Sequence, residues 1–310
     1  MIQVENISKS YGTTKAVNNI SFRVRKGDVL GFLGPNGAGK STTMRMLTCY
    51  LSPDEGTARI DGFDIHQDPI EIRKKIGYLP ENNPLYLDMG VIEYLKFIAK
   101  IRQIPKSSLK TKVDRAIEIC GLGSYCHKDI GELSKGYRQR LGLAQALIHD
   151  PEVLILDEPT IGLDPHQIIE IRHLIKSIGG EKTIIISSHI LPEISATCDR
   201  VLIIAKGQIV GSGTPQELAS MSGGSLTIST GIRGPREEVL NAINRLEGAV
   251  SIKHLSEESG VNSFNLTADK DLSEEIFFMV SKNGWSLTEL HREEINLEDV
   301  FLDLTTKEAS

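Results

Sequence analysis

The sequence predicts an α/β protein with a mostly parallel sheet, followed by a smaller α+β domain. Several short apolar runs have the composition of strands buried on both faces, as in parallel sheets. They lie at residues 28–33, 76–79, 153–158 and 183–187. Segments with helical periodicity separate these runs, and a second series of strands and helices begins after the small-residue stretch 222–225.

Composition limits the class of protein. The chain of 310 residues is long enough for two domains with a sizeable core. Its formal net charge of -6 argues against a general nucleic-acid binder, which usually presents a basic face. The cysteines lack the spacing of a metal site or a disulfide frame, so we expect buried, reduced thiols. They are Cys49, Cys120, Cys126 and Cys198.

No apolar run approaches the length of about 20 residues that spans a bilayer. The first residues, Met1 to Glu5, lack the basic and apolar regions of a secretion signal. We therefore expect a cytoplasmic protein without direct membrane insertion, which acts at a membrane only through a partner.

The first strands are expected at Ile2–Ile7 and Ile20–Val24, where apolar and polar residues alternate. Tyr11 stands beside Gly12 between them. One interpretation is a platform on which an adenine base stacks, and the other is a turn tyrosine that covers the small sheet.

A phosphate-binding loop follows the apolar run at 28–33. Residues 34–41 match the pattern G-x-x-x-x-G-K-[ST] at every fixed position, and a helix is expected to follow. The residues expected at the nucleotide are Gly34, Pro35, Asn36, Gly37, Ala38, Gly39, Lys40, Ser41 and Thr42. Glycines let backbone N–H groups approach phosphate oxygens, and the helix N-terminus adds unpaired donors. We expect Lys40 to reach the β- and γ-phosphates and the Ser41 hydroxyl to ligate Mg²⁺.

The next elements lead to a polar loop at a strand end. A strand is expected at Thr57–Ile60, a short helix at Ile70–Lys75 and a core strand at Ile76–Leu79. The prolines and asparagines of residues 80–84 do not fit a ladder, so this segment is a loop. Glu81 is therefore a candidate for binding metal or water, with a solvated surface glutamate as the alternative.

A helical insertion is expected from Val91 to Cys120, with a break at Pro105. Another helix is expected to begin at Ser134, which suits an N-cap, and its free N–H groups suit an anion. The spacing of Ser134, Gly136 and Gln139 distinguishes this segment from an ordinary charged helix.

Asp157 and Glu158 end the apolar run at 153–158. A strand of this composition is buried on both faces, so its terminal acids emerge at the carboxyl edge of the sheet, beside the phosphate loop. Ionised carboxylates there are costly unless they are paired or bound to metal. We expect Asp157 to hold Mg²⁺ and Glu158 to orient or deprotonate an attacking water.

Two further polar residues follow. Asp164 precedes Pro165 and suits a helix N-cap, a role that alone explains it. His189 is the only one of the eight histidines expected at the carboxyl end of a core strand. It suits a contact with a γ-phosphate, and a purely structural histidine is the alternative.

Composition also sets the domain boundaries. We expect a first domain at 1–221, with a helical subdomain at about 85–150, and a linker at 222–225. The second domain, 226–310, has the order βαββαβ of a ferredoxin-like fold, with helices at Arg236–Leu246 and Leu272–Asn283 and a last helix at Leu297–Leu304. It carries no visible catalytic constellation, and packing, dimerisation or regulation are its possible roles.

These motifs, in this order, resemble those of ABC-type ATPases, the nucleotide-binding subunits of ATP-binding-cassette transporters. The resemblance covers residues 1 to about 221. The matching positions are Tyr11 in the aromatic loop, Gly34 to Thr42 in Walker A, Glu81 in the Q-loop, Leu133 to Gln139 in the signature, Leu156 to Glu158 in Walker B, Asp164 in the D-loop and His189 as the switch histidine. The resemblance implies a P-loop core with an antiparallel β subdomain and a helical subdomain, and ATP and Mg²⁺ as cofactors.

It also implies that two such domains, expected as a homodimer, sandwich two ATP molecules head to tail. Ser134 and Gly136 of one domain then contact the γ-phosphate bound by Lys40 of the other, so that hydrolysis requires dimerisation. The resemblance further implies an integral membrane permease as partner, contacted through the surface near Glu81 to Ile98.

Two positions depart from the common pattern: Lys135 replaces a frequent glycine, and Glu81 replaces a glutamine. Both variants resemble ATPases that serve ABC-2-type permeases, and residues 78–86 resemble the gliding-motility-associated subgroup. The leading hypothesis is an exporter ATPase. One alternative is a soluble ABC ATPase that acts on ribosomes or DNA, although this acidic single cassette lacks the insertions common there. The other is a regulatory chain with little hydrolysis.

Overall fold

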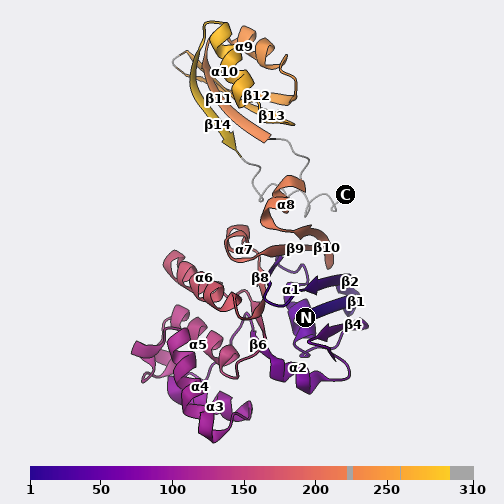
Figure 1. Cartoon of the computed structure of the whole chain (residues 1–310), viewed down its shortest axis with the longest axis vertical. Coiled ribbons are helices and arrows are strands. Elements are labelled where there is room, and N and C mark those ends of the chain that lie inside the picture. Colours follow the sequence, from indigo (N-terminus) through magenta and orange to yellow (C-terminus); the bar gives the residue numbers. More distant parts are fainter. Residues whose placement is uncertain (222–225, 259, 294–310) are drawn as a thin grey trace. The chain divides into compact units, whose positions relative to one another are not determined.

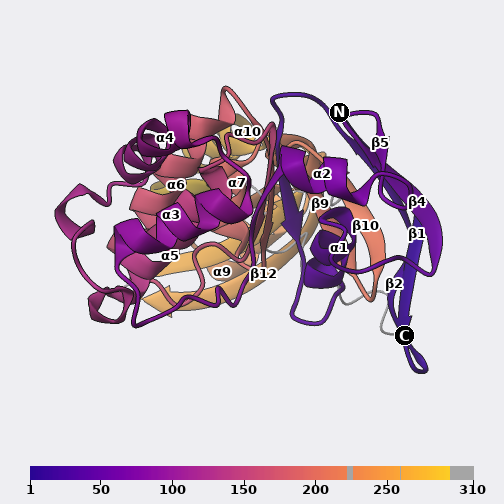
Figure 2. The ribbon, with the colours of Figure 1, turned by 90° about the horizontal axis from the view of Figure 1, so that it is seen from below.

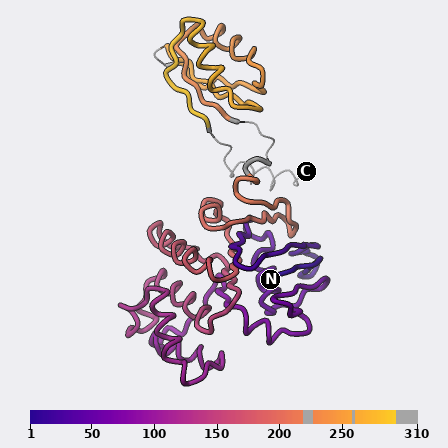
Figure 3. The backbone as a smooth tube through the Cα atoms, viewed as in Figure 1, coloured from indigo at the N-terminus to yellow at the C-terminus, as the bar shows by residue number. Residues whose placement is uncertain are grey.

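The computed structural model describes residues 1–221, 226–258 and 260–293 (Figure 1). The chain folds into two compact units, Met1–Thr214 and a second that begins at Pro215 (Figure 3). The division falls before the predicted linker, because helix α8, Pro215–Met221, groups with the second unit. Among the described residues, no helix has both the length and the apolar composition to cross a membrane.

The first unit contains an antiparallel sheet in the order β2-β1-β4-β5. Its strands are β1 (Ile2–Tyr11), β2 (Thr14–Val24), β4 (Glu55–Ile60) and β5 (Phe63–Asp64). The predicted N-terminal strands are confirmed, and the turn between them contains Gly12, whose φ is 59°. The sequence analysis did not predict β5, because a strand of two residues is too short to show an alternating pattern.

A second sheet has the order β10-β9-β3-β8-β7-β6, with β10 antiparallel and the other strands parallel. Its strands are β3 (Val29–Leu33), β6 (Ile76–Leu79), β7 (Val153–Asp157), β8 (Thr183–Ser188), β9 (Arg200–Ala205) and β10 (Gln208–Gly213). Every residue of β3, β7 and β8 is buried. The predicted parallel sheet with strands buried on both faces is therefore confirmed.

Helices alternate with the strands of the first unit along the chain. They are α1 (Lys40–Leu47), α2 (Pro69–Lys75), α3 (Val91–Ile101), α4 (Lys106–Ile119), α5 (Lys135–Leu147), α6 (Pro165–Gly179) and α7 (Leu191–Thr197), with short 3₁₀ turns at Gly123–Tyr125 and Ile130–Glu132. Pro105 is the N-cap of α4, which confirms the predicted break. Figure 2 shows α3, α4 and α5 at one end of the unit and β1, β2 and β4 at the other.

One hydrophobic cluster joins the two sheets of this unit across α1. The rings of Phe22 in β2 and Phe32 in β3 have centroids 5.6 Å apart. Met44 and Met46 of α1 are fully buried in the same cluster. Burying a side chain of this size contributes about 1.5–3 kcal/mol, so the antiparallel sheet fixes the helix that follows the phosphate loop.

The second unit contains an antiparallel sheet in the order β12-β13-β11-β14. Its elements are β11 (Leu226–Arg233), α9 (Arg236–Ile243), β12 (Ala249–Glu258), β13 (Val261–Ala268), α10 (Ser273–Lys282) and β14 (Ser286–Glu293). This strand order confirms the ferredoxin-like prediction. Helix α9 ends at Ile243 rather than at the predicted Leu246. The predicted helix at 297–304 lies outside the described residues.

Candidate active site

The carboxyl ends of β3, β8 and β7 meet at one edge of the sheet, because these strands are parallel neighbours. The phosphate loop leaves β3, His189 follows β8, Asp157 ends β7, and Glu158 comes next. This edge is where open α/β sheets bind ligands. The fold thus brings together three motifs that are far apart in the sequence.

Close backbone packing fixes the shape of the loop. Gly39 has a φ of 105°, and a Cβ there would lie 2.4 Å from the carbonyl oxygen of Ala16. Gly37 has a φ of 79°. Any residue other than glycine would have a strained backbone at both positions. The Gly207 N–H donates to the carbonyl oxygen of Ala38 at 3.0 Å and ties the loop to the β9–β10 turn.

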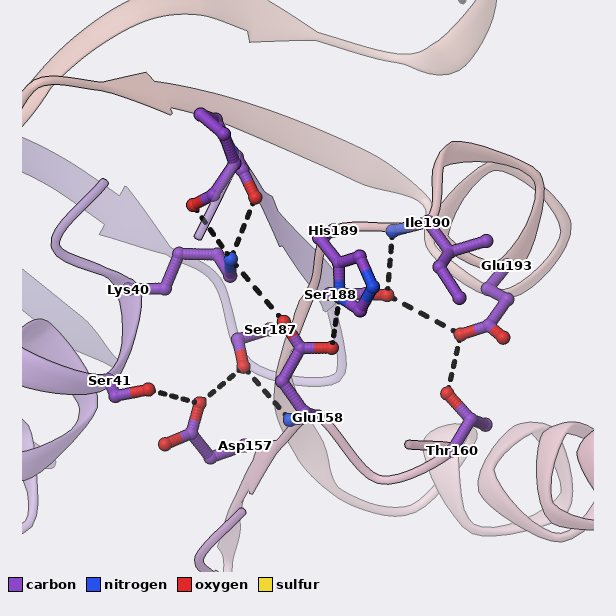
Figure 4. Close-up of polar contacts among 12 residues, drawn as sticks. Lys40, Ser41, Asp157, Glu158, Thr160, Ser187, Ser188, His189, Ile190 and Glu193 are labelled. Carbon is purple, nitrogen blue, oxygen red and sulfur yellow. Dashed lines mark hydrogen bonds and ion pairs between the residues drawn. The ribbon is translucent and has the colours of Figure 1, made fainter. Parts of the chain in front are cut away.

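Lys40 begins α1, and its side chain is 6% exposed. Its ammonium donates to the carbonyl oxygens of Gly34 at 2.7 Å and Pro35 at 3.2 Å. It also lies 3.3 Å from Glu158 Oε1 (Figure 4). A buried ammonium that faces the inside of a phosphate loop is suited to bind an anionic group.

Ser41 and Asp157 form a pair of hard oxygen donors. The Ser41 hydroxyl donates to Asp157 Oδ1 at 3.1 Å, and the Ser187 hydroxyl donates to the same oxygen at 2.5 Å. Burial raises the pKa of Asp157, although these two hydrogen bonds oppose the shift. A buried carboxylate beside a hydroxyl matches the ligands that Mg²⁺ prefers, so these residues fit the predicted cation.

Glu158 is held by its backbone and by both carboxylate oxygens. Its φ of 50° lies in the left-handed region, which is strained for a residue with a side chain. Its N–H donates to the Ser187 hydroxyl at 3.0 Å. His189 Nδ1 lies 3.0 Å from Glu158 Oε2, while Oε1 faces Lys40. The carboxylate is therefore fixed between a cation and an imidazole.

A cavity of about 440 Å³ lies at this edge. Its lining includes nine of the predicted residues, namely Tyr11, Asn36, Gly37, Gly39, Lys40, Ser41, Thr42, Glu81 and Glu158, together with Ala16 and Ile161. Sequence reasoning missed Ala16 and Ile161, because neither carries a polar group that signals a site. Tyr11 is 50% exposed.

Other predicted residues do not line this cavity. Five of them lie in segments that adjoin the cavity, namely Gly34, Pro35, Ala38, Asp157 and His189. The other four lie elsewhere: Gly136 and Gln139 are in α5, Ser134 directly precedes α5, and Asp164 directly precedes α6. Ser134 caps α5 by accepting from the Tyr137 N–H at 3.4 Å. Asp164 caps α6 by accepting from the Gln167 N–H at 2.9 Å. Both predicted N-caps are confirmed.

The first turn of α5 packs against the start of α6. A Cβ on Gly136 would lie 2.6 Å from the Gln167 side chain, and the Lys135 side chain lies against Gly162. Gln139 has a buried amide nitrogen without a partner in the described part of the chain. Sequence reasoning did not single out Tyr137, whose ring centroid lies 3.8 Å from that of Tyr125.

Comparison with known proteins identifies the family. The family described as "ABC transporter" matches residues 17–161, and a family described as "AAA domain, putative AbiEii toxin, Type IV TA system" matches residues 129–196. The linearmycin resistance ATP-binding protein LnrL of Bacillus subtilis is 33% identical over 98% of this chain and 98% of its own length. The chain belongs to the ABC transporter ATP-binding proteins. It is therefore an ATP-binding ATPase of a family that couples hydrolysis to transport.

Further relatives of this ABC ATPase have named transport roles. A Nod factor export ATP-binding protein I of Burkholderia orbicola is 36% identical over 99% of this chain and 97% of its own length. A bacitracin transport ATP-binding protein BcrA of Bacillus licheniformis is 44% identical over 68% of each chain.

Solved structures support the fold of this ABC ATPase. The structure of cbiO1 from Clostridium perfringens, part of the ABC transporter complex cbiONQ, has a TM-score of 0.65 at 28% identity and covers 79% of this chain and 95% of its own. The ATP-binding cassette MJ0796, in a dimeric structure bound to ADP and phosphate, has a TM-score of 0.64 at 22% identity and covers 69% of this chain and 98% of its own. The predicted P-loop ATPase core is thereby confirmed.

Proposed function

We propose that this ABC ATPase energises a separate ABC-2-type membrane permease, as part of an exporter, through ATP-driven head-to-tail dimerisation. The observation that carries the proposal is the close approach of Lys40, Glu158 and His189 at the cavity that the phosphate loop lines. The names of two relatives, which concern linearmycin resistance and Nod factor export, support the exporting direction. They also favour transport over the alternative role on ribosomes or nucleic acid.

Each side chain has a role that suits its surroundings. Lys40 binds the β- and γ-phosphates, because its buried ammonium faces the loop. Glu158 orients or deprotonates the attacking water, with its carboxylate held in place by His189 and Lys40. Ser41 and Asp157 hold Mg²⁺, with Glu81 as a further oxygen donor. When bound, the cation neutralises charge on the phosphate oxygens.

A second copy of the chain completes the site in this proposal. Ser134 and Gly136 do not line the cavity of their own chain, and the N-terminus of α5 carries backbone N–H groups that suit an anion. The α5 N-terminus of the partner then approaches the γ-phosphate from the side opposite Lys40. Gln139 and Asp164 lie at the same dimer interface, and Tyr11 stacks on the adenine.

The permease docks on the surface that begins near Glu81. Three apolar side chains of this segment are exposed, Tyr86 by 58%, Leu87 by 48% and Phe97 by 37%. Tyr86 packs edge-on against Phe97, with ring centroids 5.8 Å apart. Exposed aromatic clusters mark protein interfaces. The ATPase then lies at the cytoplasmic face of the membrane, held there by the permease.

The test is the ATPase rate as a function of protein concentration, together with size-exclusion runs with and without ATP. Wild-type activity should rise faster than linearly with concentration, and the Glu158→Gln variant should dimerise only with ATP. A linear rate without an ATP-dependent dimer would refute the composite site. Absence of any co-purifying membrane protein after detergent extraction would refute the permease, and salt-dependent binding to RNA or DNA would support the alternative role instead.

A further inference from the structure

Glu193, in the first turn of α7, is a buried carboxylate that the proposed mechanism does not use. The residue is 8% exposed. Its Oε2 accepts hydrogen bonds from the Thr160 hydroxyl at 2.5 Å and from the Ser188 hydroxyl at 3.4 Å (Figure 4). Within the described ranges, no lysine or arginine forms an ion pair with it.

Burying a carboxylate without a cation is unfavourable in free energy, because the carboxylate loses its hydrating water and gains only a few neutral hydrogen-bond donors. A first-turn acid also interacts favourably with the helix dipole, but an exposed carboxylate does the same without the cost of burial. The two hydroxyl partners therefore point to a more specific role.

Both hydroxyls belong to segments that carry proposed catalytic groups. Thr160 lies two residues after Glu158, whose backbone is in the left-handed region with a φ of 50°. Ser188 directly precedes His189, and its hydroxyl also accepts from the Ile190 N–H at 3.0 Å. One carboxylate thus connects the turn after Glu158 with the residues that flank His189.

We propose that Glu193 is a positioning residue for ATP hydrolysis, which holds Glu158 and His189 in the geometry of their 3.0 Å contact. Its contact with Thr160 restrains the turn that begins at the strained residue Glu158. Through Ser188, it restrains the backbone on both sides of His189. This proposal rests on the proposed roles of Glu158 and His189.

The experiment measures kcat and KM for ATP, the Kd of a fluorescent ATP analogue, and Tm for a set of variants of the full chain. Glu193→Ala removes the acceptor, Glu193→Gln keeps an acceptor oxygen, and Thr160→Val removes one donor. Thr197→Val is the matched control, because the buried Thr197 hydroxyl donates to the Glu193 carbonyl oxygen at 2.7 Å and, within the described residues, forms no hydrogen bond with Thr160 or Ser188.

Glu193→Ala should lower kcat about 10- to 100-fold, the cost typical of a misplaced catalytic group, while the Kd of the analogue stays within twofold. Glu193→Gln should restore most of kcat. Thr160→Val combined with Glu193→Ala should cost no more than Glu193→Ala alone, because both changes break the same bond. Thr197→Val should lower Tm but leave kcat unchanged.

Three results would overturn the proposal: a kcat for Glu193→Ala no lower than for Thr197→Val, a loss of nucleotide binding equal to the loss of kcat, or equal losses for Glu193→Gln and Glu193→Ala. Glu158→Gln is measured in the same assay. If that variant keeps the wild-type rate, the proposed function of Glu158 fails. If it is inactive while Glu193→Ala is not, only the role of Glu193 fails.

Discussion

Lys40 Nζ lies 3.3 Å from Glu158 Oε1, and each of the two side chains is 6% exposed. The pair joins the cation proposed to bind phosphate to the carboxylate proposed to act on water. Phosphate oxygens that enter the loop compete with Glu158 for the ammonium. In the proposed function, His189 is then the side chain that keeps the Glu158 carboxylate in place while Lys40 binds phosphate.

The first prediction concerns this pair. Lys40→Met leaves Glu158 buried without its cation and should lower the free energy of unfolding by about 3–5 kcal/mol, and it should abolish measurable ATP hydrolysis. Glu158→Gln added to Lys40→Met should recover most of that loss, because the buried carboxylate that lost its cation is then replaced by a neutral amide. Denaturant titration of the single and double variants measures the coupling, and strictly additive losses would contradict it.

A second prediction concerns Asp157. Burial raises its pKa, so the folded state binds a proton more readily than the unfolded state, and stability falls as pH rises from 3.8 through the folded pKa. Asp157→Asn removes the charge and should raise Tm at pH 7 while it abolishes Mg²⁺-dependent hydrolysis. The gain should vanish below pH 3.8, where the wild-type carboxyl is protonated in both states. A variant less stable than wild type at pH 7 would contradict this account.

The third prediction uses His149, whose pKa burial lowers to about 4, with Arg102 adding to the shift. The unfolded state binds more protons than the folded state between about pH 4 and 6.5, so stability falls as pH decreases through this window. The loss attributable to His149 should reach about 3 kcal/mol. His149→Gln should show a shallower decline in urea titrations across the same window. Parallel pH profiles for the two proteins would refute the assignment.

The fourth prediction tests whether each ATPase site is formed by residues of two chains or by the residues of one chain alone. Lys40→Met and Ser134→Arg should each be inactive alone. In a mixture, a heterodimer would contain one site with an intact Lys40 from one chain and an intact Ser134 from the other. Mixing the two variants should therefore restore a measurable ATPase rate. No recovery, despite a heterodimer detected by size exclusion, would count against contributions in trans.

Much of the fold could be predicted from the sequence, because its strongest signals are local. The apolar runs at 28–33 and 153–158 indicate strands that need no knowledge of their neighbours, and Pro105 and Pro165 mark helix starts. Helix α7 was missed, because its N-cap residue is Ile190, which has no side-chain oxygen to signal a helix start.

Part of the site could be predicted from local signals. The glycine spacing of the phosphate loop indicates Lys40, and the two adjacent acids at the end of an apolar strand indicate Glu158. Glu193 could not be predicted, because a glutamate in a short amphipathic segment normally faces water. Its burial depends on Thr160, which comes 33 residues earlier in the chain. The contact between Gly39 and Ala16 is likewise a product of tertiary packing.

The strand order has a consequence for how the protein is made. β3, Val29–Leu33, is synthesised early, yet both of its neighbours, β8 and β9, come from residues 183–205. At typical translation speeds the ribosome needs on the order of ten seconds or more to supply them. Throughout that interval this fully apolar segment lacks both strands that hydrogen-bond to it, so nascent chains of this protein should depend on chaperones until Ala205 has left the exit tunnel.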